Sequence, residues 1–488
     1  MSLLPVLEET KIKSGVHVVF LDEAFVKRLR QKKSSSTVLV DLFRFERMEG
    51  KLGSWVMDSR KSEESRRTLY VGLGSSLTLE SYRHAAASAY HILKARACRQ
   101  AALVFPSSFP KRLSAFGVAQ ALTEGWLLAS YKFDRYKKKE RKKIMSACLL
   151  VKDPTWRKQT QKGVERGEFF ATAAMLARDW VNTPAAHATP KDLADAARAL
   201  AKTHRSVSVK IHDEAALKRM KAGGILAVGQ GSEHPPVLVH LVYKPKRKAK
   251  KKIALIGKGL TFDSGGLSLK PADAMVNMKC DMAGAATVLG VFSVLEVLQV
   301  PHEVHGFFAA CENMPSGHAI RPGDIVKMMN GTTVEIANTD AEGRITLADT
   351  LTYAQRYAPD VMVDFATLTG ACLVALGEEI AGILSTSPVW KKHFLAAAKT
   401  VGEKMWELPL EQKYKKLLES DTADLRNLGN KYGGVLTAGL FLEHFVGKTP
   451  WIHADIAGPA FAEKAFEPYI AKGGTGFGVR SCLQFLIS

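Results

Sequence analysis

Four short apolar runs, far apart in the sequence, most narrowly limit what this chain can fold into. They are residues 253–256, 304–310, 361–365 and 451–456. They lack the polar alternation of a half-exposed sheet, which is typical of strands covered by helices on both faces. Glycine or polar residues follow each run, so we expect several strand ends to meet in one crevice, where α/β proteins place their ligands.

The first half of the chain predicts a further, smaller α/β unit. Short β-branched runs alternate there with helical patterns, which is typical of a largely parallel sheet. We expect helices over 79–99, 113–130 and 169–181, and strands over 17–21, 37–42, 68–73, 101–105 and 147–151. Another helix is predicted over 190–201, because Thr189 can cap it and Pro190 suits its first position.

A length of 488 residues exceeds one typical hydrophobic core, so we predict two domains. The predicted division is an N-terminal α/β domain over 1–165, a linker helix over 166–185, and a larger α/β domain over 186–488. The larger domain is expected to hold a mixed sheet covered by helices on both faces. The lysine-rich run 244–252 lies between two predicted strands, 237–243 and 253–256, and is interpreted as an exposed hairpin loop.

Composition indicates a globular protein of the cytoplasm. Hydrophobic residues make up 46% of the chain and charged residues 24%, which excludes the disordered and membrane classes. No apolar stretch approaches the roughly 20 residues that a membrane span needs, and no basic segment precedes the first apolar run, as a secretory signal requires. The six cysteines form no CxxC pair, which is typical of reduced thiols.

The charge of the chain is unevenly distributed. Up to residue 252 there are 49 Lys and Arg against 23 Asp and Glu, whereas the remainder has 20 against 25. The excess is concentrated in lysine runs at 27–33, 136–143 and 244–252. Solvated loops explain such runs, but an N-terminal half that faces a polyanion such as nucleic acid explains them too.

The heptad Asn-Thr-Asp-Ala-Glu-Gly-Arg at 338–344 places two carboxylates and a guanidinium within seven residues. A predicted strand precedes it and an apolar helical stripe follows it, so the cluster is expected at a buried strand-to-helix turn. Burial of Asp340 and Glu342 is costly unless a cation joins them, and Arg344 likewise needs an anion. A divalent metal ion is the simplest neutraliser, although a structural salt bridge with Arg344 explains the heptad equally well.

Four further charged residues precede the heptad in glycine-rich surroundings: Lys258, Asp263, Lys270 and Asp281. Each has an ordinary explanation on its own. An isolated Asp263 suits a turn that bonds its own backbone, Asp281 suits a helix cap, and Lys270 before a proline suits solvated surface. Together with the heptad they suit two divalent ions bridged by carboxylates, as in hydrolytic two-metal sites. Ligands rich in oxygen favour Zn²⁺ or Mn²⁺, with Mg²⁺ or Co²⁺ as alternatives.

On these residues the chain resembles the leucyl aminopeptidase family (cytosol aminopeptidases) of dinuclear metallo-exopeptidases. The heptad is that family's signature, and the four preceding charged residues match it in order and spacing. The resemblance runs from about residue 176 to the C-terminus, through Gly433-Gly434 and 453–458. Before that, only the size and α/β pattern of the family's macro-like N-terminal domain match.

The resemblance implies a role for each residue of the cluster. Asp263 and Glu342 would bridge the two metal ions. Lys258, as a neutral amine, and Asp281 would complete the tighter site, and Asp340 would complete the exchangeable one. It further implies that Lys270 polarises the scissile carbonyl and that Arg344 holds a bicarbonate ion, which serves as general base.

The resemblance also implies a substrate pocket and an assembly. The pocket residues would be Met278, Thr367, Gly370, Ala457 and Ala460. Ala460 stands where a larger Met is familiar, so the pocket could be wider than a Leu-selective one. The expected function is removal of the N-terminal, mostly apolar residue from peptides, by a homohexamer. Nucleic-acid binding by the basic half is the alternative. Nucleotide binding by the N-terminal domain ranks lower, because no glycine-rich phosphate loop is evident there.

Overall fold

The computed structural model describes residues 6–7, 15–31, 42–43, 46–58, 67–138 and 145–488. The chain divides into two compact units. The first unit comprises Met1–Thr172 and Ala465–Ala471, and the second comprises Ala173–Lys464 and Lys472–Ser488. The break falls inside helix α5 (Arg157–Asn182), and the return of 465–471 to the first unit has no counterpart in the sequence-based division.

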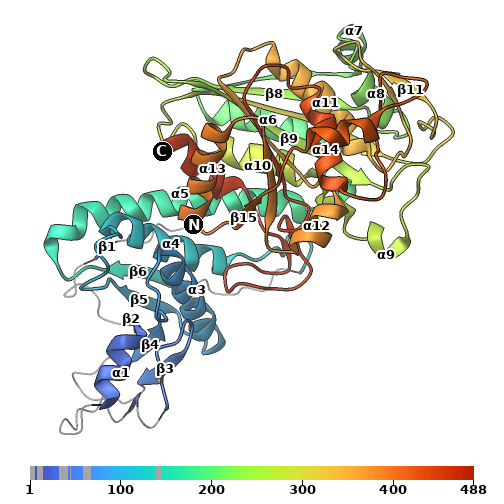
Figure 1. Cartoon of the computed structure of the whole chain (residues 1–488). Coiled ribbons are helices and arrows are strands. Elements are labelled where there is room, and N and C mark those ends of the chain that lie inside the picture. The colour runs from blue at the N-terminus through green and yellow to red at the C-terminus, as the bar shows by residue number, and fades with distance from the viewer. Residues whose placement is uncertain (1–5, 8–14, 32–41, 44–45, 59–66, 139–144) are drawn as a thin grey trace. The chain divides into compact units, whose positions relative to one another are not determined.

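The first unit contains a six-stranded sheet in the order β1-β6-β5-β2-β4-β3 (Figure 1). All neighbouring pairs are parallel except β3 and β4. Its elements are β1 (Val6–Leu7), β2 (Val16–Leu21), α1 (Glu23–Gln31), β3 (Trp55–Asp58), β4 (Thr68–Gly72), α3 (Leu79–Ala95), β5 (Gln100–Val104), α4 (Ala115–Ser130) and β6 (Ser146–Leu150). The predicted α/β class is confirmed. The strand predicted over 37–42 lies almost wholly outside the described residues.

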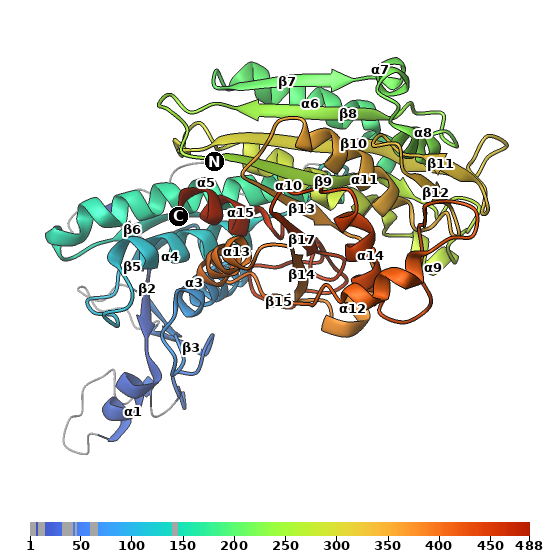
Figure 2. The same ribbon diagram turned by 45° about the horizontal axis from the view of Figure 1, so that its top comes forward.

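The second unit is built on an eight-stranded mixed sheet in the order β15-β14-β17-β13-β9-β10-β8-β7 (Figure 2). A parallel centre runs from β17 to β10, and antiparallel pairs flank it on both sides. The strands are β7 (Val207–His212), β8 (Val237–Tyr243), β9 (Lys252–Asp263), β10 (Glu303–Asn313), β13 (Val361–Ala366), β14 (Ala381–Ser385), β15 (Met405–Glu407) and β17 (Trp451–Asp455). The predicted mixed sheet is confirmed.

Helices cover both faces of this sheet. On one face, α8, α11 and α14 join Ala254 and Ile256 of β9 in one hydrophobic core. On the other, every residue of α10 is buried, and the backbone of α10 touches β9 so closely that a Cβ on Gly257 would lie 2.4 Å from Gly284. The helices of this unit are α5, α6 (Pro190–Thr203), α7 (Glu214–Arg219), α8 (Gly223–Gly229), α9 (Ala272–Met275), α10 (Ala283–Phe292), α11 (Glu342–Gln355), α12 (Gly370–Leu376), α13 (Pro388–Val401), α14 (Gly434–Glu443) and α15 (Val479–Ile487).

Two small sheets complete the second unit. One contains β11 (Ile325–Lys327), β12 (Thr333–Glu335) and β16 (Leu425–Arg426), and the other contains β18 (Phe461–Ala462) and β19 (Gly473–Gly474). The predicted cap of α6 is confirmed, because the Thr189 side chain accepts a hydrogen bond from the Asp192 N–H.

Two predictions about β9 are wrong. The run 244–252 is exposed but closes no hairpin, because β10 lies between β8 and β9 and bonds to both. The strand also continues through Gly257 and Gly259 to Asp263, so Lys258 lies inside the strand rather than after it. Glycine serves here for close approach of the neighbouring backbone and not for a turn.

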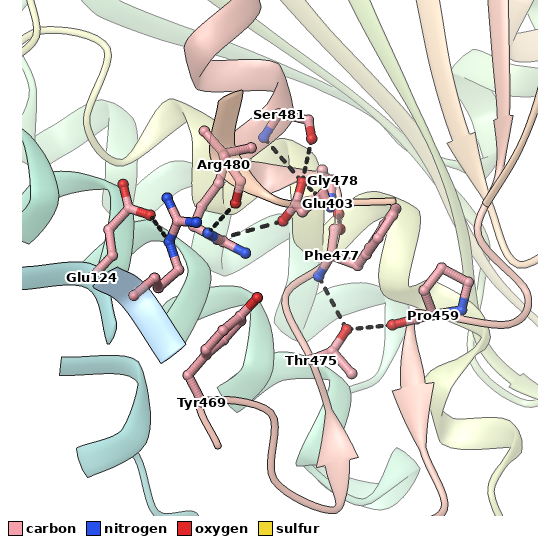
Figure 3. A network of polar contacts seen from close by, with 12 residues as sticks. Glu124, Glu403, Pro459, Tyr469, Thr475, Phe477, Gly478, Arg480 and Ser481 are labelled. Carbon is pink, nitrogen blue, oxygen red and sulfur yellow. Dashed lines mark hydrogen bonds and ion pairs between the residues drawn. The ribbon is translucent and has the colours of Figure 1, made fainter. Parts of the chain in front are cut away.

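The C-terminal helix α15 is fixed by one buried acid, Glu403 (Figure 3). Its carboxylate accepts hydrogen bonds from the backbone N–H groups of Gly478 (3.1 Å) and Ser481 (3.0 Å), and from the Ser481 hydroxyl. The Arg480 guanidinium lies 3.6 Å from the other carboxylate oxygen. A negative charge at the positive end of a helix is stabilising, so Glu403 holds the start of α15 in place against the buried core.

No helix in the described ranges is long and apolar enough to cross a membrane.

Candidate active site

A bulge in β9 brings Lys258 and Asp263 to one face. Successive side chains of a strand alternate, so Lys258 and Asp263, five residues apart, would ordinarily point to opposite faces. The pairing with β10 skips one residue, however: Leu260 lies opposite Cys311 and Phe262 lies opposite Glu312. The extra residue restores the parity, as bulges beside active sites often do. Both side chains therefore reach the acidic cluster at the start of α11.

The Lys258 ammonium lies in a buried cage of oxygens. It is 2.8 Å from the Asp281 carboxylate and 2.9 Å from Glu342, and it donates to the Thr367 carbonyl at 2.9 Å. Burial acts to lower the pKa of Lys258, but the charges of Asp281 and Glu342 outweigh it and raise that pKa. Gly343 makes the cage possible, since a Cβ there would lie 2.6 Å from the Lys258 Nζ.

A second cation, Lys270, joins two further acids. Its ammonium is 2.9 Å from Asp263 and also pairs with Asp340. Its side chain is only 15% exposed, so the interpretation as solvated surface is wrong. Burial acts to lower the pKa of Lys270, and the carboxylates around it raise the pKa instead. The five predicted metal ligands and Lys270 thus form one continuous charged cluster.

Burial disfavours the ionised form of three acids in the cluster. Burial raises the pKa of Glu342 to about 8, and the charge of Asp263 acts in the same direction. Burial also raises the pKa values of Asp281 and Asp340. Four carboxyl groups share two ammonium groups, and all of them except the exposed Asp340 are buried. The predicted burial is therefore confirmed for Glu342 and wrong for Asp340. Such strongly shifted groups mark functional sites.

Of the ordinary explanations for the acids, the turn at Asp263 is confirmed, whereas the helix cap at Asp281 and the salt bridge to Arg344 are wrong. Asp281 belongs to the 3₁₀ turn η4 (Met278–Met282), and the N-cap position of α10 is Met282, so Asp281 is not the cap of that helix. Asp263 does accept a hydrogen bond from the Gly265 N–H at 2.9 Å, as an ordinary turn former would. Arg344 forms no ion pair with Asp340 or Glu342 in the described part of the chain, which makes the salt-bridge alternative wrong.

Arg344 forms its hydrogen bond with the backbone instead of with these acids. Its Nη1 donates to the Asn427 carbonyl at 2.8 Å, while its Nε is buried and has no hydrogen-bond partner among the described residues. Burial lowers the pKa of Arg344 to about 10, although Glu342 and Asp455 act in the opposite direction. A buried guanidinium with an unused donor fits a small anion bound beside the heptad.

The donor set also fits divalent cations. One oxygen from each of Asp263, Asp340 and Glu342 lies within 4.8 Å of the others. The second carboxylate oxygen of Glu342 is buried, and no group in the described part of the chain donates a hydrogen bond to it. An unpaired acceptor in this position is costly unless a ligand meets it, and hard oxygen donors suit divalent metal ions.

The predicted pocket residues occupy two loops and the turn η4 near this cluster. The Thr367 hydroxyl donates to Asp281 at 2.7 Å, and Gly370 begins α12 directly after that loop. Ala457 and Ala460 follow β17, and the Ala460 side chain is buried, with its carbonyl bonded to Thr475. Met278 begins η4, the turn that also contains Asp281.

Three residues that hold the site together had not been predicted. Asp455 accepts hydrogen bonds from Leu368, Thr369 and Ala457, and so ties the two pocket loops to each other. The strand 451–456 was predicted, but nothing in the sequence distinguished its last acid as a buried acceptor.

The other two are amides that bind the loops of the cluster. Asn313 donates to the Asp263 carboxylate at 2.8 Å and to the Thr339 carbonyl at 3.0 Å. The Asn427 side chain accepts from the Ala337 N–H and donates to the Asn338 carbonyl, so it holds the heptad in place from far along the sequence. The position of Asn313 at a strand end was the one available signal.

Comparison with known proteins agrees with this geometry. Residues 175–483 match the model of the cytosol aminopeptidase family, catalytic domain, and residues 19–140 match the N-terminal domain of the same family. The chain belongs to the cytosol aminopeptidase family. It is therefore a hydrolase of the aminopeptidase class, and its substrates are peptides. The resemblance inferred from the sequence motifs is confirmed.

Members of the family match the whole length of the chain. A probable cytosol aminopeptidase of Aquifex aeolicus is 40% identical over 98% of this chain and 96% of its own. Among solved structures, tomato leucine aminopeptidase, in a mutant form, has a TM-score of 0.87 at 33% identity, covering 100% of this chain and 97% of its own. The bottromycin maturation enzyme BotP, solved in complex with Mn, has a TM-score of 0.86 at 34% identity, covering 97% and 99%.

Proposed function

We propose that the chain removes the N-terminal residue of peptides with the help of two divalent metal ions, within a catalytic domain that spans 186–488. The observation that carries the proposal is the cluster of four carboxylates, three of them buried, around two lysines, in which one Glu342 oxygen has no partner among the described residues. The residues that would hold the ions are Lys258, Asp263, Asp281, Asp340 and Glu342. Zn²⁺ and Mn²⁺ suit these donors, and a relative of the family was solved with Mn.

When bound, such ions would supply Lewis acidity and a nucleophilic water at neutral pH. The role of Lys258 as a ligand requires the neutral amine, whereas its carboxylate neighbours raise its pKa. Metal binding at Lys258 is therefore expected to release a proton, because the ligand amine must be deprotonated.

Lys270 would act on the substrate directly. Its ammonium is partly exposed at the edge of the cluster and stays charged, because Asp263 and Asp340 raise its pKa. A fixed positive charge beside the scissile carbonyl stabilises negative charge that develops on its oxygen. Arg344 would hold bicarbonate through its unused Nε donor, and that anion would accept the proton of the attacking water.

The pocket loops would set the residue preference. Met278, Thr367, Gly370, Ala457 and Ala460 are proposed to line it, with apolar, Leu-like side chains preferred. Ala460 leaves more volume than a longer side chain would, so residues larger than Leu are expected to be accepted. Comparison of kcat/KM for Phe- and Leu-p-nitroanilide measures this preference.

Leu-p-nitroanilide hydrolysis tests the proposal. The activity should vanish with a chelator and return with Mn²⁺, and metal analysis should find two ions per chain. Asp263→Asn should lower kcat/KM by about a thousandfold or more, because it removes a bridging charge. Asp273→Asn, an exposed acid of the nearby helix α9, is the matched control. Full activity of the metal-free protein, or full activity of the Asp263→Asn variant, would contradict the proposal.

Three further features remain proposals. A homohexamer is expected from the family resemblance, and sedimentation measures it directly. The names of the relatives support a cytoplasmic location. Nucleic-acid binding by the lysine-rich runs stays the alternative, and retardation of a DNA fragment that weakens with added salt is its test.

A further inference from the structure

The first unit contains a cavity that the peptidase chemistry does not use. Its volume is about 480 Å³, and all of its lining residues lie between Val19 and Trp156. The floor is formed by the carboxyl ends of parallel strands, from β2 (Val19 to Leu21) and β5 (Val104), with Val151 just after β6. The size and the largely apolar lining are those of small-molecule sites.

The topology of the sheet opens a crevice at this place. β2 and β5 are neighbours and parallel. After β2 the chain continues to β3 and then β4, both on one side of β2, and after β5 it continues to β6 on the other side. Adjacent strands whose connections leave in opposite directions form the switch point at which open α/β sheets bind ligands.

A buried hydroxyl in this cavity has no protein partner. Tyr82 is 1% exposed and lines the cavity, and in the ranges that the structure describes its hydroxyl forms no hydrogen bond. Burial, with the nearby charge of Asp22, raises its pKa to about 12, so the phenol remains a donor. Buried polar groups are rarely left unpaired, and an unpaired one facing a cavity points to a ligand or water.

Two carboxylates that line the cavity each have one oxygen bonded to the backbone and one oxygen available. Asp22 caps α1 by accepting the Phe25 N–H at 2.6 Å, and Asp153 accepts the Thr155 N–H at 2.8 Å, each through its Oδ1. Among the described residues, neither Oδ2 accepts a hydrogen bond. Lys152 also lines the cavity, so the titratable lining carries two negative charges and one positive.

Aromatic rings form the walls. Phe105 and Trp156 meet edge to face, with ring centroids 5.7 Å apart and planes at 76°. Phe25, 37% exposed, lines the cavity as well. Such walls favour a flat ring that can stack or meet ring edges, and the carboxylates favour hydrogen-bond donors and disfavour anions.

We propose that this cavity binds a small planar aromatic molecule that carries amine donors and no phosphate. A nucleoside base and an aromatic amine derived from an amino acid share this chemistry. The ring would lie among Phe25, Phe105 and Trp156, and its amine would donate to Asp22 or Asp153. A ligand with an acceptor atom, such as a nucleoside, would also accept a hydrogen bond from the Tyr82 hydroxyl.

Calorimetric titration of the full-length chain tests the proposal with adenosine, tryptamine and adenosine monophosphate. Adenosine or tryptamine should bind with a Kd of about 1 mM or tighter, and whichever binds identifies the source. The monophosphate should bind about tenfold more weakly than adenosine, because its charge faces the carboxylates. No binding of either amine, or equal binding of the monophosphate and adenosine, overturns the proposal.

Two variants locate the ligand. Tyr82→Phe removes only the hydroxyl and should weaken adenosine binding about fivefold, the effect of one hydrogen bond. Asp22→Asn keeps the helix cap but should weaken tryptamine binding about tenfold. Tyr90→Phe, buried on the same helix α3 and outside the cavity, is the control. Unchanged affinity in both test variants overturns the assignment, and unchanged peptidase activity verifies that they fold.

Discussion

Replacement of Gly343 by alanine should separate activity from stability. Gly343 lies in the first turn of α11, and a Cβ there would be 2.6 Å from Nζ and 2.4 Å from Cε of Lys258. Carbon atoms in contact prefer about 3.5 Å, so the end of the lysine must retreat by about 1 Å. Because the end of a lysine is flexible, the clash moves Lys258 and leaves the backbone in place.

The magnitudes follow from the contacts of Lys258. A misplacement of about 1 Å at a reacting centre costs on the order of a hundredfold in rate, so kcat/KM should fall by at least about that factor. Alanine in a helix interior gains up to about 1 kcal/mol over glycine. One charge-assisted hydrogen bond of Lys258, worth about 1.5–3 kcal/mol, is strained in return. The net loss in the free energy of unfolding should therefore not exceed about 2 kcal/mol.

The assay is hydrolysis of Leu-p-nitroanilide at saturating Mn²⁺, with the melting temperature measured on the same preparations. Gly317→Ala is the control, because nothing lies within 4 Å of its added Cβ, and it should change neither quantity. A Gly343→Ala enzyme with kcat/KM within about threefold of the parent would refute the reasoning about Lys258. Failure of the variant to fold would refute the stability estimate.

Three further predictions concern groups away from the metal cluster. Asp349→Asn should lower the free energy of unfolding in urea by about 2–5 kcal/mol, because the new amide cannot accept from both Gly224 and Ile225 while its oxygen serves Met329. Glu403→Gln should lower it by about 2–4 kcal/mol through loss of the charge at the start of α15. His240, whose pKa burial lowers to about 3, contributes stability above pH 6.5 that is lost as the pH falls. At pH 5 the loss is about 2 kcal/mol, and His240→Phe should remove that part of the pH dependence.

Each of these has a control and a contradicting result. Glu379→Gln, at an exposed pair with Lys404, is the control and should change the free energy of unfolding by less than about 1 kcal/mol. If Glu403→Gln changes it no more than this control, Glu403 does not stabilise the start of α15. Neutral behaviour of Asp349→Asn would mean that its backbone donors find other acceptors. The pH series should be measured with a chelator present, and an unchanged slope in His240→Phe would assign the acid sensitivity to other groups.

Local patterns predicted the elements whose causes are local. The helix at Pro190 is specified by its own cap and first residue, and strand β8 by its own apolar run. The order of strands depends on pairing between distant segments, which is why the hairpin at 244–252 was predicted wrongly once β10 was found between its strands.

The site divides in the same way. The types and spacing of the charged residues sufficed to predict the cluster, because few arrangements make three buried acids beside a fourth, exposed acid tolerable. Lys270 looked solvated on its own, since one partner, Asp340, lies 70 residues away and the loop that brings the nearer partner, Asp263, to its ammonium is not evident from the sequence. Asn427 could not have been found from any local pattern, because it acts only through contacts made after folding.

The bulge in β9 reverses the faces to which all later side chains of the strand point. Every second side chain of a strand points to the same face. The additional residue between Leu260 and Phe262 shifts this alternation by one, so that Asp263 shares a face with Lys258. Regular pairing of β9 through Thr261, without the bulge, would keep every charged residue of the cluster in the sequence and yet turn Asp263 to the opposite face. The composition of a site such as this can survive an alteration that destroys its geometry.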